Sequence, residues 1–381
     1  MMLYLDNAAT TPVRPEVLQA MLPYLTDRFG NPSSHHTVGE RAAATLRDAR
    51  ERVAAVFGMR TGDVIFTSGG TEANNLAIKG IAIAASSAHP GRAHVVTSPI
   101  EHESVLESCR YLERIHGFEV TRVAVDAGGR IDPAVVAASI TEQTALVTVG
   151  YANNEVGTVQ DAAALASIAS AARVPLHLDA VQAAGWLPLS GTGADALSIA
   201  GHKIGAPQGT GVLAVRGRIP LEPLLHGGGQ ERDRRSGTEN VAGAVAIATA
   251  LELAERDRID AATRVAGHRD AFIAAVLALV PSARLTGDPV HRLPGTASFT
   301  FAGISGEAVL LELERRGVIS SSGSACAAGS DEPSHVLLAM GIAPEIAQTA
   351  VRFTFGHGFA GDSEPIARAV ADAVAAVRSR G

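Results

Sequence analysis

Short apolar runs alternate with amphipathic stretches over the first two thirds of the chain. The runs are rich in valine, leucine and isoleucine and are too short for helices, so they predict buried strands. These predicted strands cover residues 64–67, 94–97, 119–125, 145–149, 175–179, 195–199 and 211–215. Between them, apolar residues recur at helical spacing and predict helices over residues 39–57, 71–85, 102–115 and 161–172. Strands that alternate with helices are typical of an α/β fold with a mostly parallel sheet covered on both faces.

The pattern changes in the last third of the chain. Residues 241–280 form a long alanine-rich stretch with helical spacing, for which we expect an interruption near residues 257–260. Residues 297–301 alternate between apolar and polar side chains, like an exposed strand. We therefore predict a large domain over residues 13–255 and a smaller α+β domain over residues 256–381, on which residues 1–12 pack.

The composition indicates a globular protein with a sizeable core, because 46% of the 381 residues are hydrophobic and 19% are charged. A net charge of −7, without a basic cluster that has interleaved aromatics, argues against direct nucleic-acid binding. The alanine-rich stretches are broken well before the length of a membrane span, and the first residues do not resemble a signal peptide. Two cysteines are too few for a disulfide framework. We therefore expect a cytoplasmic protein with no membrane partner.

Polar side chains follow several predicted strands, at the edge where open α/β sheets bind ligands. The most unusual is Lys203, which comes directly after Gly201 and His202 between two apolar runs. Desolvation is costly for an ammonium group, and it makes a lysine amine a nucleophile that forms Schiff bases. The alternative is a surface lysine in a hairpin turn.

Other strand ends carry groups that either bind ligands or serve the fold. Gly70 and Thr71 lie in a glycine-rich turn that opens a helix, which is either a phosphate site or a tight turn capped by Thr71. His102 is either a structural histidine or a ring that stacks on a planar ligand. Asn154 belongs to an asparagine pair typical of turns, and its amide can also donate to an anion. Asp179 either caps a helix, forms an ion pair or holds a protonated ring nitrogen.

Together, these groups match the requirements of pyridoxal phosphate. Lys203 would form the Schiff base, and Asp179 would keep the pyridine nitrogen protonated so that the ring acts as an electron sink. A metal site of His177, Asp179 and His202 is the alternative, because His177 and Asp179 share one face of a strand. No further histidine cluster supports that site, and we expect no metal.

Two residues of the C-terminal part extend this picture. Cys326 lies in a run of small, polar residues over 320–330, which predicts a mobile loop with a reactive thiol; the alternative is an incidental thiol. Cys109 falls within a predicted helix, where we expect a packed, inert thiol. Arg352 lies on a predicted strand and either forms a structural ion pair or grips a carboxylate with two hydrogen bonds.

Several segments jointly resemble cysteine desulfurases of the NifS/IscS type, in the class-V aminotransferase group. They are residues 4–11 (YLDNAATT), 67–72 (TSGGTE), 153–157 (NNEVG), 201–203 (GHK), 235–238 (RSGT) and 321–326 (SSGSAC). They fall in the family's order and span nearly the whole chain. The resemblance implies the aspartate-aminotransferase-like fold (pyridoxal-phosphate fold type I), in which the seven predicted strands form one sheet of the large domain. It also implies pyridoxal 5'-phosphate as cofactor.

The resemblance further implies how the cofactor is held. Lys203 would carry it and later move protons at the substrate Cα, and His102 would stack on its ring and assist proton transfer. Asp179 would pair with the pyridine nitrogen, and Gln182 would bond the phenolate oxygen.

The phosphate would be held by Gly70, Thr71 and His202, and by Thr238 from the partner subunit of a homodimer. Ala200 stands where many relatives carry a serine that binds the phosphate, so one hydrogen bond, worth about 1 kcal/mol, is absent here.

In the same way, the resemblance implies that Asn154, beside the cofactor, and Arg352 bind the carboxylate of L-cysteine. Cys326 would then attack the substrate sulfur and become a persulfide, with alanine as the other product. The sulfur would pass to an acceptor protein, an Fe–S scaffold or a tRNA-thiolation protein, and Cys326 would transiently contact an Fe–S cluster. The alternatives are a selenocysteine lyase or another class-V activity, and a degenerate cofactor-binding scaffold; the presence of both Lys203 and Cys326 argues against the scaffold.

Overall fold

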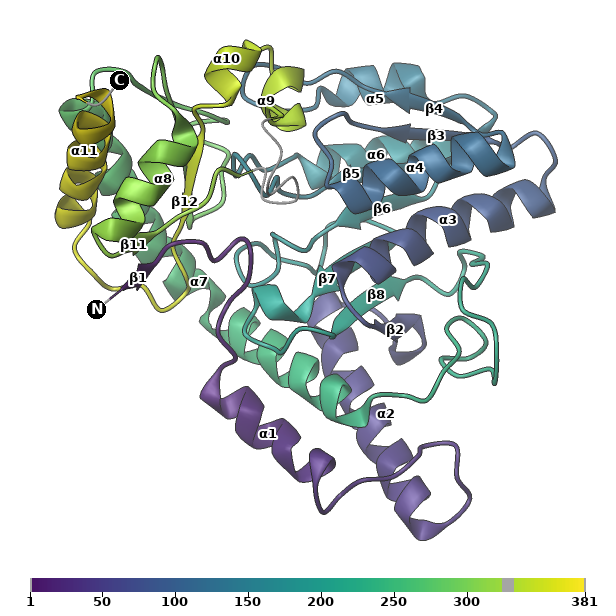
Figure 1. The fold of residues 1–381 in the computed structure, drawn as a ribbon. Helices are drawn as coiled ribbons and strands as arrows, with labels where there is room; N and C mark the ends of the chain where they lie inside the picture. Colours follow the sequence, from purple (N-terminus) through teal and green to yellow (C-terminus); the bar gives the residue numbers. More distant parts are fainter. Residues whose placement is uncertain (1, 324–331, 380–381) are drawn as a thin grey trace.

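A seven-stranded sheet organises the larger part of the computed structural model, which describes residues 2–323 and 332–379 (Figure 1). Its strands are β2 (Val64–Thr67), β3 (His94–Thr97), β4 (Glu119–Arg122), β5 (Thr144–Gly150), β6 (Leu176–Asp179), β7 (Ala196–Ala200) and β8 (Gly211–Val215). They are ordered β2-β8-β7-β6-β5-β3-β4. Strand β8 is antiparallel to both of its neighbours, and the remaining pairs are parallel. The prediction of an α/β fold with a mostly parallel sheet is confirmed.

Helices cover both faces of this sheet, because successive residues of each strand point to opposite sides. Ile65 of β2 packs with α3 (Gly70–Ala88) and α4 (Glu103–His116) on one face. Its neighbour Val64 packs on the other face, in a core with α2 (Thr37–Phe57) and α6 (Ala162–Ala172). Helix α5 (Pro133–Ser139) and the first half of α7 (Val241–Leu279) complete that second layer.

A second, smaller core lies at the far end of α7. A three-stranded antiparallel sheet of β9 (Ala283–Leu285), β10 (Thr296–Phe301) and β12 (Val351–Thr354) packs with helices α8 (Gly306–Arg315) and α11 (Glu364–Arg378). Phe272 of α7 lies at its centre, in edge contact with Phe299 and Phe353. Two short helices, α9 (His335–Ala339) and α10 (Pro344–Ala347), lie between this core and β3–β5 (Figure 1). The chain's first strand, β1 (Leu3–Tyr4), pairs in parallel with β11 (Val318–Ile319).

Helix α7 runs without a break from the first core into the second, so the predicted interruption near residues 257–260 is wrong. The charged residues there are accommodated because they form ion pairs rather than end the helix. Asp257 pairs with Arg14 at 2.8 Å, and Arg258 pairs with Glu255 at 2.9 Å. The proposed domain boundary between residues 255 and 256 falls inside this helix and stays a prediction.

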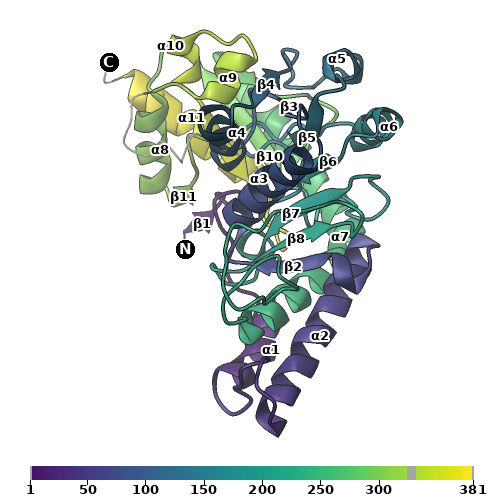
Figure 2. The same cartoon turned by 90° about the vertical axis from the view of Figure 1, so that its right-hand side faces the viewer.

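The N-terminal helix α1 (Pro15–Leu25) was not predicted from the sequence. It packs with α2 against α7, and the tips of α1 and α2 project from the molecule (Figure 2). Among the helices of residues 2–323 and 332–379, none combines the length and the apolar character needed to cross a membrane.

Candidate functional site

A cavity of about 340 Å³ lies beside the carboxyl ends of β5, β6 and β7. Its walls hold each predicted site residue except Thr238 and Cys326: Gly70, Thr71, His102, Asn154, Asp179, Gln182, His202, Lys203 and Arg352. Most of these residues are far apart in the sequence and meet there because the strands that precede them end at one edge of the large sheet. Arg352 comes from the smaller sheet. The size is in the range of small-molecule binding sites.

Lys203 ends a short 3-10 turn, Gly201–Lys203, that follows β7 directly. Its Nζ donates hydrogen bonds to the carbonyl oxygens of Ala8 at 2.5 Å and Ala9 at 2.6 Å. Gln182 donates to the same Ala8 oxygen at 3.1 Å. The N-terminal segment, which we define as residues 5–14 between β1 and α1, therefore forms part of the cavity wall through Ala8 and Ala9.

Asp179 is the last residue of β6 and is 7% exposed. Its Oδ1 accepts from the backbone N–H of Val181 at 3.0 Å, and its Oδ2 accepts from Nδ2 of Asn74 at 2.7 Å. The same Asn74 nitrogen donates to Ser104 Oγ at 2.9 Å. These bonds fix the direction of the Asp179 carboxylate at the cavity wall.

His102 caps α4 and is oriented by the same network. Its Nδ1 accepts the backbone N–H of Ser104 at 3.0 Å and lies 2.8 Å from Ser104 Oγ. When the ring is neutral, its proton is therefore on Nε2. Asn74 and His102 meet at Ser104, which links the orientation of the Asp179 carboxylate to that of the His102 ring.

One end of the cavity is suited to an anion. Helix α3 begins at Gly70, so the free N–H groups and positive dipole end of its first turn lie at the cavity wall. His202, opposite, lies 3.1 Å from Thr10 Oγ1 through its Nδ1. Burial and the charge of Lys203 lower the pKa of His202 to about 4, so its ring is neutral at pH 7.

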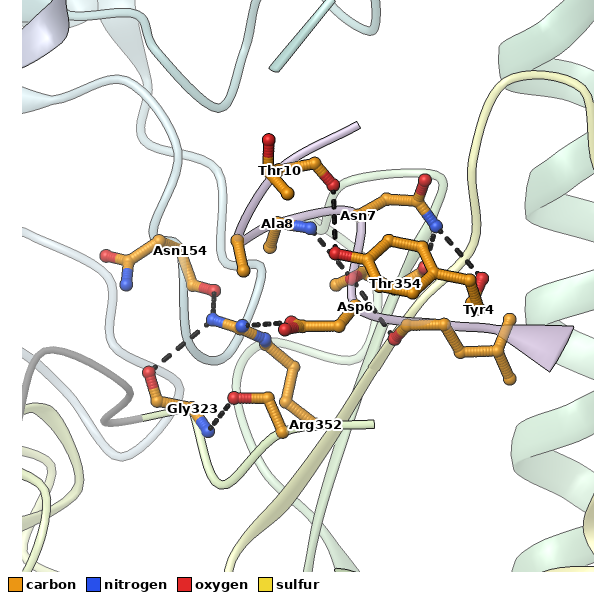
Figure 3. Close-up of polar contacts among 12 residues, drawn as sticks. Tyr4, Asp6, Asn7, Ala8, Thr10, Asn154, Gly323, Arg352 and Thr354 are labelled. Atoms are coloured by element: carbon orange, nitrogen blue, oxygen red, sulfur yellow. Dashed lines mark hydrogen bonds and ion pairs between the residues drawn. The ribbon is translucent and has the colours of Figure 1, made fainter. Parts of the chain in front are cut away.

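Arg352 lies at the other side of the cavity, on β12 of the smaller sheet, and is 2% exposed. Its Nη1 donates to the Asn154 carbonyl oxygen at 2.8 Å, and its Nη2 pairs with Asp6 Oδ1 at 2.7 Å (Figure 3). The sequence allowed either a structural ion pair or a carboxylate-binding role for Arg352. The ion pair is present, and the residue also lines the cavity.

Asn74 and Glu101, which line the cavity, and Asp6, which contacts Arg352, were not predicted from the sequence. Asn74 is 1% exposed within α3, and a buried amide in an otherwise apolar helix face was the signal available. Glu101 is 3% exposed, lines the cavity and accepts a hydrogen bond from Ser98 Oγ at 2.5 Å. Burial raises the pKa of Glu101 to about 8, so at pH 7 it is mostly the neutral acid.

Two predicted residues lie elsewhere. Thr238 is exposed in the loop before α7, outside the lining of this cavity. Cys326 lies outside the described residues. Cys109 is fully buried in α4, and burial raises the pKa of its thiol to about 12, which agrees with the expectation of an inert thiol.

The alternative metal site is not formed. Both ring nitrogens of His177 are bonded to hydroxyls, Nδ1 to Thr148 at 2.8 Å and Nε2 to Ser198 at 2.9 Å. Within residues 2–323 and 332–379, no group of three or more His, Cys, Asp or Glu side chains is arranged to hold a metal ion.

The residues present fit pyridoxal phosphate. An amine, a buried carboxylate and a helix N-terminus open into one cavity, which are the partners needed for an aldehyde, a ring nitrogen and a phosphate. Asn74 Oδ1 is buried at the cavity wall and has no hydrogen-bond partner among the described residues. A polar ligand in the cavity would supply one.

Comparisons with known proteins agree on one family. A family model described as aminotransferase class-V matches residues 3–360. The chain is 44% identical over 355 residues to cysteine desulfurase IscS of Dictyoglomus turgidum, which covers 93% of this chain and 89% of that protein. It is also 44% identical over 361 residues to the IscS-like cysteine desulfurase of Mycobacterium tuberculosis, which covers 93% of this chain and 92% of that protein.

Solved structures have the same fold. A NifS-like protein matches with a TM-score of 0.90 and 34% identity over 100% of both chains. SspA in complex with cysteine matches with a TM-score of 0.80 and 35% identity over 92% of this chain and 98% of that chain. The similarity therefore extends over the sheet, the smaller core and the cavity between them.

Proposed function

The chain belongs to the class-V aminotransferase family, and we propose that it is a cysteine desulfurase that uses pyridoxal 5'-phosphate. The observation that carries the proposal is the joint presence of Lys203, Asp179 and Arg352 around one cavity. It is supported by relatives named cysteine desulfurase and by SspA, whose structure is described in complex with cysteine.

The proposed reaction converts L-cysteine and a protein thiol to L-alanine and a protein persulfide. The C–S bond of the substrate breaks, and an S–S bond forms between the substrate sulfur and Sγ of Cys326. The thiol hydrogen of Cys326 balances the hydrogen gained by alanine, so no external oxidant or reductant is needed. When bound, pyridoxal phosphate supplies the electron sink that stabilises negative charge at the substrate Cα.

The chain's own residues bind, orient and move protons. Lys203 would bind the cofactor aldehyde through its amine, and the same amine would later move a proton at the substrate Cα. Asp179, fixed by Asn74 and Val181, would accept a hydrogen bond from the ring nitrogen. His102 would lie against the ring.

The binding contacts follow from the same cavity. The N–H groups at the start of α3 and the side chain of Thr71 would bind the phosphate, together with His202 as a neutral ring. Gln182 would bind the phenolate oxygen, and Arg352 with Asn154 would bind the substrate carboxylate. Thr238 is exposed, and we assign it the role of binding the cofactor phosphate in the active site of the partner subunit of a homodimer. The acceptor of the persulfide sulfur is a protein of Fe–S cluster assembly or of tRNA thiolation.

The test is a balance of two products. Purified protein is mixed with L-cysteine and a thiol reductant, and sulfide and alanine are measured together in the wild type and in Cys326→Ser. We expect equal amounts of both products from the wild type and neither from the variant. Lys203→Ala serves as a control and should lose the visible absorbance of the bound cofactor, which Cys326→Ser should keep.

Other outcomes would contradict the proposal. Persulfide formed at the normal rate by the Cys326 variant would overturn the assignment of the thiol. Bound cofactor without either product would point to selenocysteine or to an amino-group acceptor as the substrate, and a protein that binds no cofactor would be a scaffold.

A further inference from the structure

The guanidinium of Arg352 is held by protein partners at both of its terminal nitrogens, and the residue lines the cavity. Its Nη2 is bonded to Asp6 and its Nη1 to the Asn154 carbonyl, with the Gly323 carbonyl at 3.5 Å from the same Nη1 (Figure 3). Its Nε is buried and has no hydrogen-bond partner within residues 2–323 and 332–379. A buried N–H without a partner is costly, so the protein contacts at Nη1 and Nη2 leave part of the hydrogen-bonding capacity of this guanidinium unused.

Asp6 is the anionic partner of Arg352. Its side chain is 16% exposed and that of Arg352 is 2% exposed, so the pair is largely shielded from water. A carboxylate on Nη2 balances the buried positive charge and fixes the rotation of the planar guanidinium. Because Arg352 also lines the cavity, the orientation that Asp6 fixes is the one that a ligand in the cavity meets.

Asp6 belongs to a segment that is itself fastened to the strand of Arg352. Ala8 N donates to Thr354 Oγ1 at 2.9 Å, and Asn7 Nδ2 donates to the Thr354 carbonyl at 2.7 Å. The same segment contacts Lys203 through the Ala8 and Ala9 carbonyls. Asp6 is therefore part of a rigid wall that sets the position of Arg352 relative to Lys203.

We propose that Asp6 is a positioning residue, which holds Arg352 in the orientation that binds the α-carboxylate of the amino-acid substrate. The proposal rests on the proposed function. It also explains why the enzyme would prefer substrates that carry a carboxylate next to the amine. Asp6 acts through Arg352 and does not itself touch the substrate.

The test uses the holoenzyme and the variant Asp6→Ala. We expect KM for L-cysteine to rise about 10-fold or more while kcat changes less than about 3-fold, because the loss falls on carboxylate binding. Asp6→Asn keeps an oxygen acceptor for Nη2 without the charge, and its KM should lie between those of the wild type and Asp6→Ala. Cofactor affinity should be unchanged in both variants.

Two ligands separate positioning from general damage. L-alanine carries the amine and carboxylate, whereas 2-aminoethanethiol carries the amine and thiol of cysteine without the carboxylate. The binding of each is followed by the change in the cofactor's visible spectrum. Asp6→Ala should weaken the binding of L-alanine about 10-fold and leave that of 2-aminoethanethiol unchanged.

Two further variants complete the design. Asp257→Ala removes the ion pair with Arg14, which holds the same N-terminal segment to α7, and it should bind both ligands as the wild type does. In an Arg352→Ala background, Asp6→Ala should cause no further loss of L-alanine affinity, because the two residues act as one unit.

The inference is overturned by an unchanged or lower KM in Asp6→Ala, by equal weakening of both ligands, by additive effects in the double variant, or by loss of cofactor. Its failure is distinguishable from that of the proposed function. If the wild type makes no sulfide, the desulfurase activity is refuted. If Asp6→Ala still weakens the binding of L-alanine to that protein, the role of Asp6 is supported.

Discussion

Polar side chains around the cavity take their orientation from hydrogen bonds to neighbouring side chains. Asp179 is directed by Asn74 of α3, and His102 by Ser104 of α4, and the two pairs are joined because Asn74 also donates to Ser104. In a buried site, such bonds determine where a charge or a proton lies, because water does not replace them. A change at Asn74 would therefore act on Asp179 and His102 together.

His177 is the buried group of β6 that serves the fold rather than the cavity. Burial lowers the pKa of its ring to about 3, against an ordinary value near 6.5. As the pH falls below about 6.5, the unfolded chain takes up a proton on this ring and the folded chain does not. The free energy of unfolding therefore decreases as the pH falls, by about 2 kcal/mol between pH 7 and pH 5 from this group.

The prediction is checked by urea unfolding at pH 7 and pH 5 of the wild type and of His177→Gln, whose amide can bond the same two hydroxyls but does not titrate. The variant should lose about 2 kcal/mol less than the wild type over this interval. Comparing the two proteins cancels the titration of other histidines, such as His202. Equal losses in both would show that His177 is not the group responsible.

Residue types at the site could be predicted from the sequence, but their partners could not. Lys203, Asp179 and Gly70 lie at the ends of strands or within three residues after them, so a pattern of strand ends locates them. Asp6 and Arg352 are separated by 346 positions, and only the pairing of the N-terminal segment with the C-terminal sheet brings them together. A sequence pattern carries no information on such a long-range contact.

The helices and strands that were predicted correctly are those in which burial determines the order of apolar and polar residues. The inner strands β3, β5 and β8 of the large sheet are buried on both faces and form nearly continuous apolar runs. Helix α1 was missed because Val17 is its sole buried residue, while Leu18, Leu22 and Leu25 are each more than half exposed. A helix with exposed leucines lacks the regular apolar stripe that identifies an amphipathic helix.

The start of α3 is the element on which phosphate binding depends. A Cβ on Gly70 would lie 2.8 Å from Cγ2 of Val181 and 3.3 Å from Cβ of Ala200. Gly70→Ala therefore displaces the Val181 side chain or moves the first turn of α3, where the phosphate is proposed to bind. We expect the affinity for pyridoxal phosphate to fall about 10-fold, in line with the cost of overpacking.

Titration of the cofactor-free protein, followed by the visible absorbance of the bound cofactor, measures this change. Gly62→Ala is the matched control, because a Cβ at Gly62 meets no atom within 4 Å. It should bind the cofactor like the wild type. A Gly70→Ala protein with unchanged affinity would place the phosphate away from the start of α3.

The molecule as a whole joins two cores through α7 and the N-terminal segment. The cavity takes Lys203 and Asp179 from the edge of the large sheet and Arg352 from the smaller sheet. Any relative movement of the two cores would change the distance between the proposed amine and carboxylate sites. The contacts that hold the two cores together therefore determine the geometry of the cavity, as do the residues that line it.

Trp186 is one such contact, because its side chain packs against both cores and its ring stacks on His357, with centroids 3.8 Å apart. Trp186→Ala should lower the free energy of unfolding by about 3 kcal/mol, because it leaves a cavity between the cores. Urea unfolding of the holoenzyme measures the loss, and Trp186→Phe, which keeps a stacking ring, should recover more than half of it. A loss below about 1 kcal/mol would mean that α7 and the N-terminal segment hold the cores together without Trp186.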